Sequence, residues 1–371
     1  MRTRRTLRQV RCRRAHDSIG GGPTGDDRLA GSGALLDQHW SIMQTRTLGR
    51  TARTVSVIGL GTWQLGADWG EVAEGDAFAV LDAAHDAGVT FFDTADVYGD
   101  GRSESLIGAW LRANPGSGVT VATKMGRRMP QEHANYSADH FRAWVDRSRA
   151  NLGVETLDLV QLHCPPSTVY GDDRVFDALD ALVDDGSIAA YGVSVERVDE
   201  ALTAIARPNV ATVQIILNAF RLKPLDEVLP AAVAAGVGII ARVPLASGLL
   251  SGRYTSDTIF AANDHRSFNR HGEAFDVGET FSGVDYETGV RAASEFTELA
   301  RDAAPTATPA QVALAWIASQ PGVSSVIPGA RSPQQARANA EAGSLQLPPS
   351  FDGAVRELYD REIRAAVHER W

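Results

Sequence analysis

Four side chains able to hold or move a proton stand where apolar segments of the sequence end. Asp93 and Tyr98 lie in the stretch FFDTADVYG, Lys124 lies in VTVATKM, and His163 ends LDLVQLH. Taken singly, each has an ordinary structural explanation, as a turn cap, a packed ring or a hydrogen-bonded histidine. Lys124 is the hardest to explain in this way, because 34 of the 36 basic residues are Arg and only two are Lys.

These four residues together suit proton donation to a carbonyl oxygen. A tyrosine hydroxyl, with a reference pKa near 10, is a slow acid at neutral pH, and a lysine within about 4–6 Å favours its ionised form. We therefore expect Lys124 to lower the pKa of Tyr98 and Asp93 to keep Lys124 charged. His163 is expected to orient a substrate oxygen. Such a set can protonate a carbonyl that receives a hydride.

Strand-like apolar segments alternate with helical patterns from residue 55 onward. We expect strands over 55–63, 89–95, 119–125, 157–163, 188–194, 211–218, 237–245 and 323–330. Helices are expected over 74–88, 103–113, 138–153 and 174–186. Eight such repeats predict an α/β fold that is a single (β/α)8 TIM barrel, whose strands bring their C-terminal ends to one face.

Two further segments complete the expected barrel. Residues 46–56 predict a short N-terminal hairpin, and residues 252–288 predict a long loop after strand 7 at the catalytic face. A doubly wound sheet is the competing architecture. It would favour G-x-G-x-x-G after the first strand, and GLGTWQLG departs from this pattern because position 64 is Gln.

The first 42 residues differ in composition from the rest. They are rich in Arg and turn-forming residues but lack the apolar region of a signal peptide. We expect residues 1–42 to be a disordered tail, which could come from an upstream start, and residues 43–371 to form the folded protein. The alternative is a basic arm that seeks nucleic acid or membranes.

Charge and composition narrow the partners of the folded part. The chain of 371 residues has a net charge of −10; leaving out eight Arg and four Asp of the tail gives 28 basic and 42 acidic groups, or −14. Such a body predicts no nucleic-acid partner. No apolar run has membrane-spanning length, which predicts no membrane partner. The two widely separated cysteines, Cys12 and Cys164, favour free thiols and a cytoplasmic location.

The motifs FFDTADVYG, VATKMG, LVQLH and SVIPGARSPQQARANA resemble those of the aldo-keto reductase superfamily over residues 43–345. The resemblance implies an NAD(P)H-dependent reductase of a small-molecule carbonyl substrate, with hydride from the nicotinamide and the proton from Tyr98. It places the family's catalytic tetrad on Asp93, Tyr98, Lys124 and His163. Sugars, small aldehydes and quinone-like carbonyls all remain open as substrates, and the oligomeric state is open too.

Two other functional classes are alternatives to the reductase. Some barrels of this type are cofactor-sensing regulatory subunits, which an intact tetrad does not exclude. A metal-dependent hydrolase lacks support, because His163 is the only histidine at an expected strand end, and we predict no metal.

The same resemblance implies where a nicotinamide cofactor binds. Arg331 is placed to meet a 2′-phosphate, which favours NADPH, with NADH as the other possibility. The implied cofactor-binding residues are Gly61, Thr62, Trp63, Asp93, Ser194, Gln214, Arg242, Pro244, Leu245, Ser247, Gly248, Leu250, Gly329, Arg331, Gln335 and Asn339.

Two positions depart from the family pattern. Val195 stands where many members have Asn, and Arg242 stands where an aromatic ring often stacks on the nicotinamide. We expect Arg242 to lie beside that ring and to disfavour the oxidised, cationic cofactor. The alternative is that Arg242 points to a loop carboxylate such as Asp264 or Asp276.

Side-chain alternation along a strand gives one more expectation. Because Cys164 follows His163 directly, it should face away from the site if the strand continues. The substrate pocket is expected to be aromatic with some positive charge, from loops 63–72, 126–137 and 252–288. Its candidate side chains are Trp63, Trp69, Arg127, Arg128 and Tyr136.

Overall fold

The computed structural model describes residues 43–66 and 73–371. The tail predicted for residues 1–42 lies outside the described residues, and so does Trp69. Within the described ranges, no helix is long and apolar enough to cross a membrane.

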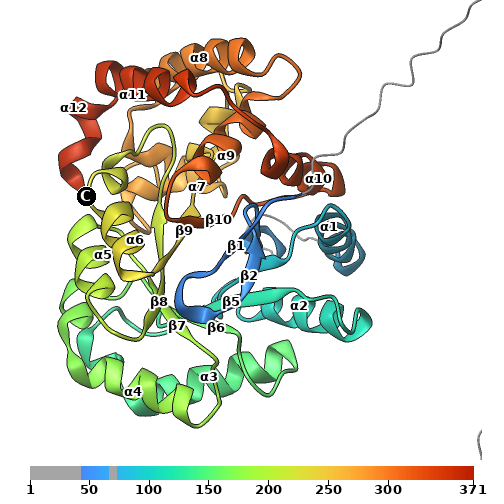
Figure 1. Ribbon diagram of the computed structural model, residues 1–371, viewed down its shortest axis with the longest axis vertical. Helices are drawn as coiled ribbons and strands as arrows, with labels where there is room; N and C mark the ends of the chain where they lie inside the picture. The colour runs from blue at the N-terminus through green and yellow to red at the C-terminus, as the bar shows by residue number, and fades with distance from the viewer. Residues whose placement is uncertain (1–42, 67–72) are drawn as a thin grey trace, which may run out of the picture. The chain divides into compact units, whose positions relative to one another are not determined.

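Eight parallel strands form one curled sheet, in which neighbours in sequence are neighbours in space (Figure 1). Parallel bridges join Ile58 to Val326 and Gly61 to Gly329, so the last strand lies beside the first. Every residue of β4 to β10 is buried, which is typical of parallel strands covered by helices. The strands are β3 (Leu60–Gly61), β4 (Phe91–Asp93), β5 (Thr120–Met125), β6 (Leu159–His163), β7 (Tyr191–Ser194), β8 (Val210–Ile216), β9 (Gly238–Arg242) and β10 (Val323–Val326).

The N-terminal part differs from the expectation of one strand over 55–63. Strand β1 (Thr45–Thr47) pairs antiparallel with β2 (Thr54–Ser56), outside the parallel sheet. The chain changes partners within this segment, since Ser56 pairs with Thr45 whereas Ile58 bridges to Val326. A continuous strand over 55–63 was therefore a wrong prediction.

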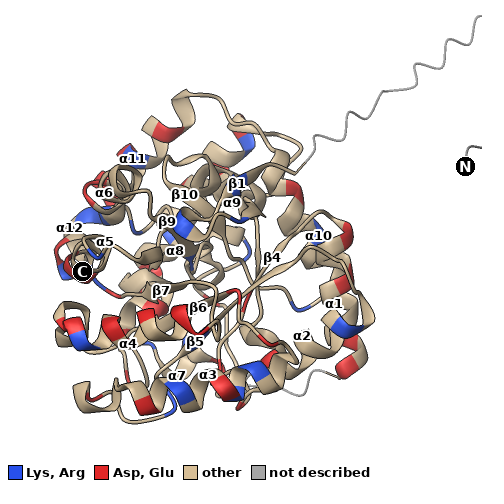
Figure 2. Cartoon of the chain, turned by 60° about the horizontal axis from the view of Figure 1, so that its bottom comes forward, with Lys and Arg blue, Asp and Glu red and all other residues tan. Residues whose placement is uncertain are grey.

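Helices follow the strands along the chain, and their acidic and basic residues lie mainly on the outer surface (Figure 2). The first four begin and end within two residues of the expected ranges. The longer helices are α1 (Glu74–Asp86), α2 (Arg102–Ala113), α3 (Ala138–Leu152), α4 (Asp173–Asp184), α5 (Val198–Ile205), α6 (Val228–Ala235), α8 (Tyr286–Ala303), α9 (Pro309–Ser319), α10 (Pro333–Glu341) and α11 (Ser350–Glu362), and the short ones are α7 (His265–Phe268) and α12 (Arg364–Val367).

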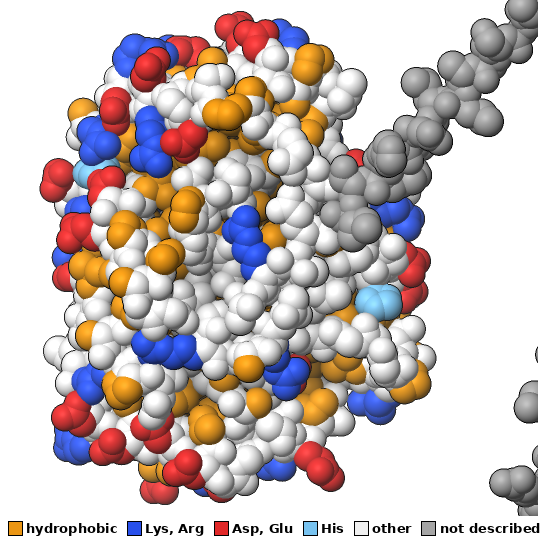
Figure 3. All heavy atoms as spheres, viewed as in Figure 1, with side chains coloured by type: hydrophobic (Ala, Val, Ile, Leu, Met, Phe, Trp, Pro, Cys, Tyr) orange, Lys and Arg blue, Asp and Glu red, His pale blue; other side chains and the backbone are white. Residues whose placement is uncertain are grey.

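The segment between β9 and α8 contains only short helical turns. Besides α7, it holds 3-10 turns at Ala246–Ser251, Val277–Glu279 and Phe281–Gly283. On the face of the described residues seen in Figure 3, basic and acidic side chains are interspersed and form no broad basic surface.

Candidate active site

A buried ion pair joins the ends of β4 and β5. Nζ of Lys124 lies 2.5 Å from Oδ1 of Asp93 and also donates to the carbonyl of Thr94 at 2.9 Å. The hydroxyl of Tyr98, in the loop after β4, lies 3.3 Å from the same Nζ. The parallel pairing of the two strands thus brings together three residues that are separated by up to 31 positions in the sequence.

The second oxygen of Asp93 is held by two amides from the sheet. Nε2 of Gln214 donates to Oδ2 at 2.8 Å, and Nε2 of Gln161 donates at 3.1 Å. Gln161 was not among the residues predicted for the site. The sequence could have predicted its place in the site, because Gln161 lies two residues before His163 and alternation places both side chains on one face of β6.

The pKa of Tyr98 differs from the sequence expectation. Burial of the phenol raises its pKa above the usual value, and the charge of Lys124 opposes this shift without overcoming it. The predicted lowering was therefore wrong, because it left out the cost of an ion in a buried site. Burial alone would lower the pKa of Lys124, but Asp93 and Tyr98 raise it overall. The arrangement at neutral pH is thus a neutral phenol beside a charged ammonium.

His163 completes the group from the end of β6. Its ring centroid lies 6.1 Å from that of Tyr98, at an interplanar angle of 81°. Burial, reinforced by the charges of Arg127, Lys124 and Arg242, holds the pKa of His163 well below its usual value. The ring is therefore neutral, and its Nδ1 has no hydrogen-bond partner among the described residues.

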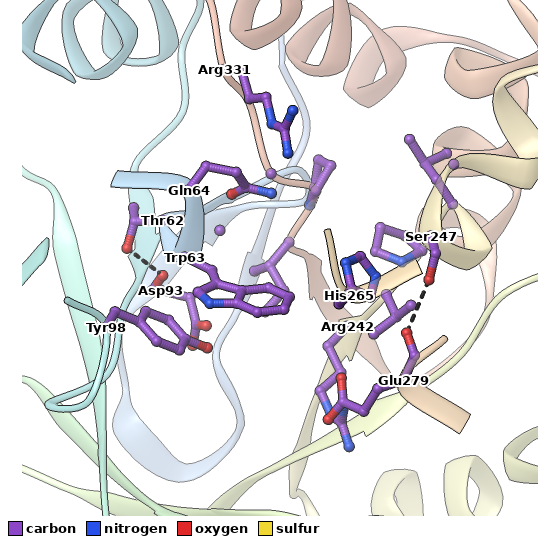
Figure 4. Close-up of a pocket in the computed structure, with 18 of the residues that line it drawn as sticks. Thr62, Trp63, Gln64, Asp93, Tyr98, Arg242, Ser247, His265, Glu279 and Arg331 are labelled. Carbon is purple, nitrogen blue, oxygen red and sulfur yellow. Dashed lines mark hydrogen bonds and ion pairs between the residues drawn. The ribbon is translucent and has the colours of Figure 1, made fainter. Parts of the chain in front are cut away.

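These side chains open into a cavity of ≈ 370 Å³ at the C-terminal ends of the strands (Figure 4). All but three of the predicted catalytic and cofactor-binding residues line this cavity. The predicted residues that line it are Gly61, Thr62, Trp63, Asp93, Tyr98, His163, Ser194, Gln214, Arg242, Pro244, Leu245, Ser247, Gly248, Gly329, Arg331 and Gln335.

The three remaining residues support the cavity from behind. Lys124 acts through Asp93 and Tyr98, Leu250 is fully buried, and Nδ2 of Asn339 donates to the carbonyl of Gly329 at 3.2 Å. Eight lining residues were not predicted by name, although five of them lie in loops 63–72 and 252–288, which were expected to form the pocket. The eight are Gln64, Val243, Tyr254, His265, Arg266, Glu279, Ile327 and Pro328.

Two glycines leave room in the cavity wall that a side chain would fill. Gly248 has φ 97°, and a Cβ there would lie 2.6 Å from the hydroxyl of Tyr254. A Cβ on Gly329 would lie 2.1 Å from Nε2 of Gln64. Together with Arg331 at the cavity edge and the unpartnered Nδ1 of His163, these features fit an extended, phosphate-bearing dinucleotide.

Arg242 has different partners from those expected. Its Nη2 lies 2.9 Å from Oε2 of Glu196, and its Nη1 lies 2.6 Å from Oε1 of Glu279, a residue of the long loop. The alternative, that Arg242 points to a loop carboxylate, is therefore confirmed, although the carboxylate is that of Glu279 rather than Asp264 or Asp276. The two carboxylates offset the positive charge of the guanidinium, which weakens the expected bias against the oxidised cofactor, and the position of Arg242 beside the nicotinamide stays a prediction.

The expectation for Cys164 applied only if the strand continued past His163. Strand β6 ends at His163, and Cys164 has φ 49°, so alternation no longer applies. Its Sγ lies 3.4 Å from Oγ of Ser194 and 3.8 Å from Nη2 of Arg242, two residues that line the cavity. The condition of the expectation is therefore not met, and Cys164 contacts two lining residues without lining the cavity itself. Burial raises the pKa of the thiol to about 12, so the thiol stays protonated.

The expected pocket side chains separate into two groups. Trp63 lines the cavity and packs near His265 and Phe275, with centroid distances of 5.5 and 6.2 Å. Arg128 instead pairs with Asp100, and the hydroxyl of Tyr136 donates to Gln131 at 2.8 Å. Neither Arg128 nor Tyr136 lines the cavity, contrary to expectation.

Arg127, another expected pocket side chain, does not line the cavity either. Its Nε donates to the carbonyl of His163 at 3.2 Å, and its Nη2 lies 3.5 Å from Oε1 of Glu196. No group of three or more His, Cys, Asp or Glu residues in the described ranges could hold a metal ion.

The fold and this site define an oxidoreductase barrel, and comparison with known proteins gives the family. The profile of the Aldo/keto reductase family matches residues 57–360. The chain therefore belongs to the aldo/keto reductase family.

Two relatives illustrate the range of the match. An uncharacterized oxidoreductase of Mycobacterium tuberculosis is 34% identical over 304 residues, which cover 79% of this chain and 86% of the relative. A probable voltage-gated potassium channel subunit beta of Oryza sativa is 31% identical over 323 residues, which cover 81% of this chain and 91% of the relative.

Two solved structures share the fold. A glycerol dehydrogenase from Gluconobacter oxydans has a TM-score of 0.71 and 28% identity, with coverage of 88% of this chain and 97% of that one. An aldo-keto reductase from Klebsiella pneumoniae in complex with NADPH has a TM-score of 0.65 and 25% identity, with coverage of 86% and 95%.

Proposed function

We propose that this protein reduces an aldehyde or a ketone to an alcohol with NADPH. The observation that carries the proposal is the neutral hydroxyl of Tyr98, held 3.3 Å from the charged Lys124 at the wall of the cavity. A bound nicotinamide would supply the hydride to the carbonyl carbon.

Each residue of the tetrad has a separate part in this reaction. Tyr98 gives its proton to the carbonyl oxygen as negative charge develops there. Lys124 stabilises the resulting phenolate, and Asp93 keeps Lys124 in place and charged. The neutral His163 offers a ring nitrogen to orient the substrate oxygen.

The preference for NADPH rests on two further observations. Arg331 lines the cavity, where a guanidinium can pair with a 2′-phosphate. The similar Klebsiella pneumoniae structure contains NADPH. NADH remains the second candidate. We also propose a cytoplasmic location, on the basis of the two separated cysteines.

A panel of carbonyl compounds tests the proposed reaction. Sugars, small aldehydes and quinones are each mixed with NADPH or NADH, and oxidation of the reduced cofactor is followed by absorbance. We expect turnover that depends on Tyr98 and is faster with NADPH. Turnover that persists unchanged in Tyr98→Phe would contradict the assigned role.

A cofactor-sensing regulatory subunit is the second candidate. The similarity to a probable potassium channel subunit beta supports it, though less than the intact tetrad supports the enzyme. The two functions are separated by measuring NADPH binding and turnover on the same preparation. Tight binding with no turnover across the whole panel would favour the sensor.

A further inference from the structure

The side chain of Trp371 is packed against the loop that follows β9. Its Nε1 lies 3.0 Å from Oδ1 and 3.2 Å from Oδ2 of Asp276. Only 7% of the residue is exposed, and the guanidinium of Arg221 lies 3.8 Å from the ring centroid. The ring therefore touches both the loop and the segment after β8.

Two glycines let the loop approach this ring closely. A Cβ on Gly278 would lie 2.9 Å from Cζ2 of Trp371, and a Cβ on Gly283 would lie 2.3 Å from Cη2. Gly283 also has φ 73°, which disfavours other residues. Segment 276–283 is thus shaped around Trp371.

Asp276, which accepts from Trp371, is connected to the wall of the cofactor cavity through one short turn. The carboxylate that accepts from Trp371 also accepts from the backbone N–H of Gly278 at 2.7 Å, which caps the short turn Val277–Glu279. That turn presents Glu279 to Arg242 at 2.6 Å. The carbonyl of Glu279 accepts from Oγ of Ser247, a second residue of the cavity wall, at 2.9 Å.

Arg221 connects Trp371 to the other partner of Arg242. Its Nη2 donates to the carbonyl of Glu196 at 2.7 Å while its guanidinium lies over the Trp371 ring. The carboxylate of Glu196 pairs with Arg242. Of the two carboxylates that hold Arg242, Glu279 therefore lies in a segment that contacts Trp371, and Glu196 is bonded to Arg221, which contacts Trp371.

We propose that Trp371 is a positioning residue for the cofactor cavity, because it clamps segment 276–283 and Arg221 so that Glu279 and Glu196 hold Arg242. The proposal rests on the proposed function, since the cavity is taken to bind NADPH. Without the clamp, segment 276–283 samples open states and the binding-competent form is less populated. Affinity for NADPH then falls, whereas the tetrad, which Trp371 does not touch, keeps its geometry.

The test compares the full-length parent with Trp371→Ala, Trp371→Phe and Trp316→Phe. Trp316 is the matched control, because its Nε1 also donates to a carboxylate, Asp352, at 3.0 Å and it does not line the active-site cavity. Two measurements are made: the dissociation constant for NADPH, and trypsin cleavage of the cofactor-free protein after Arg253, Arg266 and Arg270, followed by mass spectrometry.

For Trp371→Ala we expect faster cleavage at these arginines and a dissociation constant about tenfold higher, as when the competent form falls to about a tenth of the population. The kcat at saturating NADPH should stay within about threefold of the parent, because only binding is affected. Trp371→Phe keeps the ring but loses the bond to Asp276, so it should partly restore both readouts. Trp316→Phe should match the parent.

Unchanged NADPH affinity or unchanged cleavage in Trp371→Ala would overturn the clamp, and so would equal effects in Trp316→Phe. Should Trp371→Ala fail to fold, Asp276→Ala and Trp371→Phe replace it, and both should show faster cleavage and weaker NADPH binding than the parent, by less than is expected for Trp371→Ala. Failure of the parent to bind NADPH would instead contradict the proposed function. In that case, trypsin cleavage of the cofactor-free parent and variants would still test whether Trp371 holds segment 276–283 in place.

Discussion

Nζ of Lys124 lies 2.5 Å from Oδ1 of Asp93, and only 2% and 3% of these side chains are exposed. A charge pair at this depth is stable only while both members and their hydrogen-bond partners are present. Asp93 has two more donors, from Gln161 and Gln214. The pair therefore connects the stability of the barrel to the chemistry of Tyr98.

Replacing Lys124 by Met should cost both activity and stability. The change leaves the carboxylate of Asp93 buried without its cation, and we expect a loss of about 3–5 kcal/mol in the free energy of unfolding. Urea denaturation measures this loss. The double variant Lys124→Met/Asp93→Asn should recover much of the stability and none of the activity. A single-variant loss below about 1 kcal/mol, the range of exposed pairs, would contradict this account.

Replacing Tyr98 by Phe should remove the proton donor and little else. We expect kcat for carbonyl reduction to fall by about 10²–10⁴-fold, the range of general acid catalysis, with NADPH affinity nearly unchanged. Steady-state kinetics and equilibrium binding measure the two effects. Tyr136→Phe is the matched control, since that hydroxyl bonds to Gln131 away from the cavity. Activity within about tenfold of the parent in Tyr98→Phe would mean that another group supplies the proton.

Asp96 should make the protein less stable as the pH rises. It is 1% exposed, and neither carboxylate oxygen has a hydrogen-bond partner among the described residues. Burial, with the nearby charge of Glu104, raises the pKa of Asp96 to about 8, whereas the unfolded value is near 4. Because the pKa of Asp96 is higher in the folded than in the unfolded protein, its contribution to the free energy of unfolding is complete below pH 4. This contribution is lost as the pH rises to 8, by at most about 1.4 kcal/mol per pH unit.

The test of this pH dependence is Asp96→Asn. Its advantage over the parent in free energy of unfolding should grow between pH 5 and pH 8, as measured by denaturation at several pH values. Asp257 is exposed, so Asp257→Asn serves as the control. Its difference from the parent in free energy of unfolding should not change with pH. A constant difference for Asp96→Asn would show that Asp96 is ionised throughout.

Glu279→Gln should change how the protein discriminates between the two cofactor forms. The oxidised nicotinamide is cationic, and removing a nearby carboxylate leaves Arg242 less balanced. Two unit charges about 4 Å apart interact by about 1 kcal/mol in a water-like medium, so we expect binding of NADP⁺ to weaken about fivefold more than binding of NADPH. Titration with each form measures the ratio of dissociation constants. A ratio equal to that of the parent would exclude the electrostatic effect.

Cys164→Ser should retain more than about half of the activity, because the thiol packs against Ser194 and Arg242 without lining the cavity. With its pKa near 12, Cys164 should also react slowly with iodoacetamide at pH 8. A Cys12→Ser background isolates this thiol. Rapid alkylation that abolishes turnover and is blocked by NADPH would contradict the packing role.

Much of the fold follows from local sequence patterns. Helices α1 to α4 begin and end close to the expected ranges, since amphipathic periodicity and Gly stops act within one segment. The convergence of Asp93, Lys124 and His163 follows from the same information, because parallel strands bring their C-terminal ends to one face of a barrel. The division of residues 55–63 between two pairings could not be read locally, because one partner, Val326, is distant in sequence, although the other, β1, is close.

The electrostatics of the site depended on tertiary structure. The direction of the Tyr98 pKa follows from burial by surrounding segments, and the partners of Arg242 come from positions 46 residues before it and 37 residues after it. Residues 252–288 have no periodicity that would place Glu279 or His265 in the cavity wall. The sequence by itself therefore determined which residues meet at the strand ends, since the local patterns give eight β–α repeats and the C-terminal ends of parallel barrel strands share one face. Only the tertiary structure decided their charge states and the ion pairs of Arg242, because burial and long-range ion pairs depend on segments that no local pattern connects.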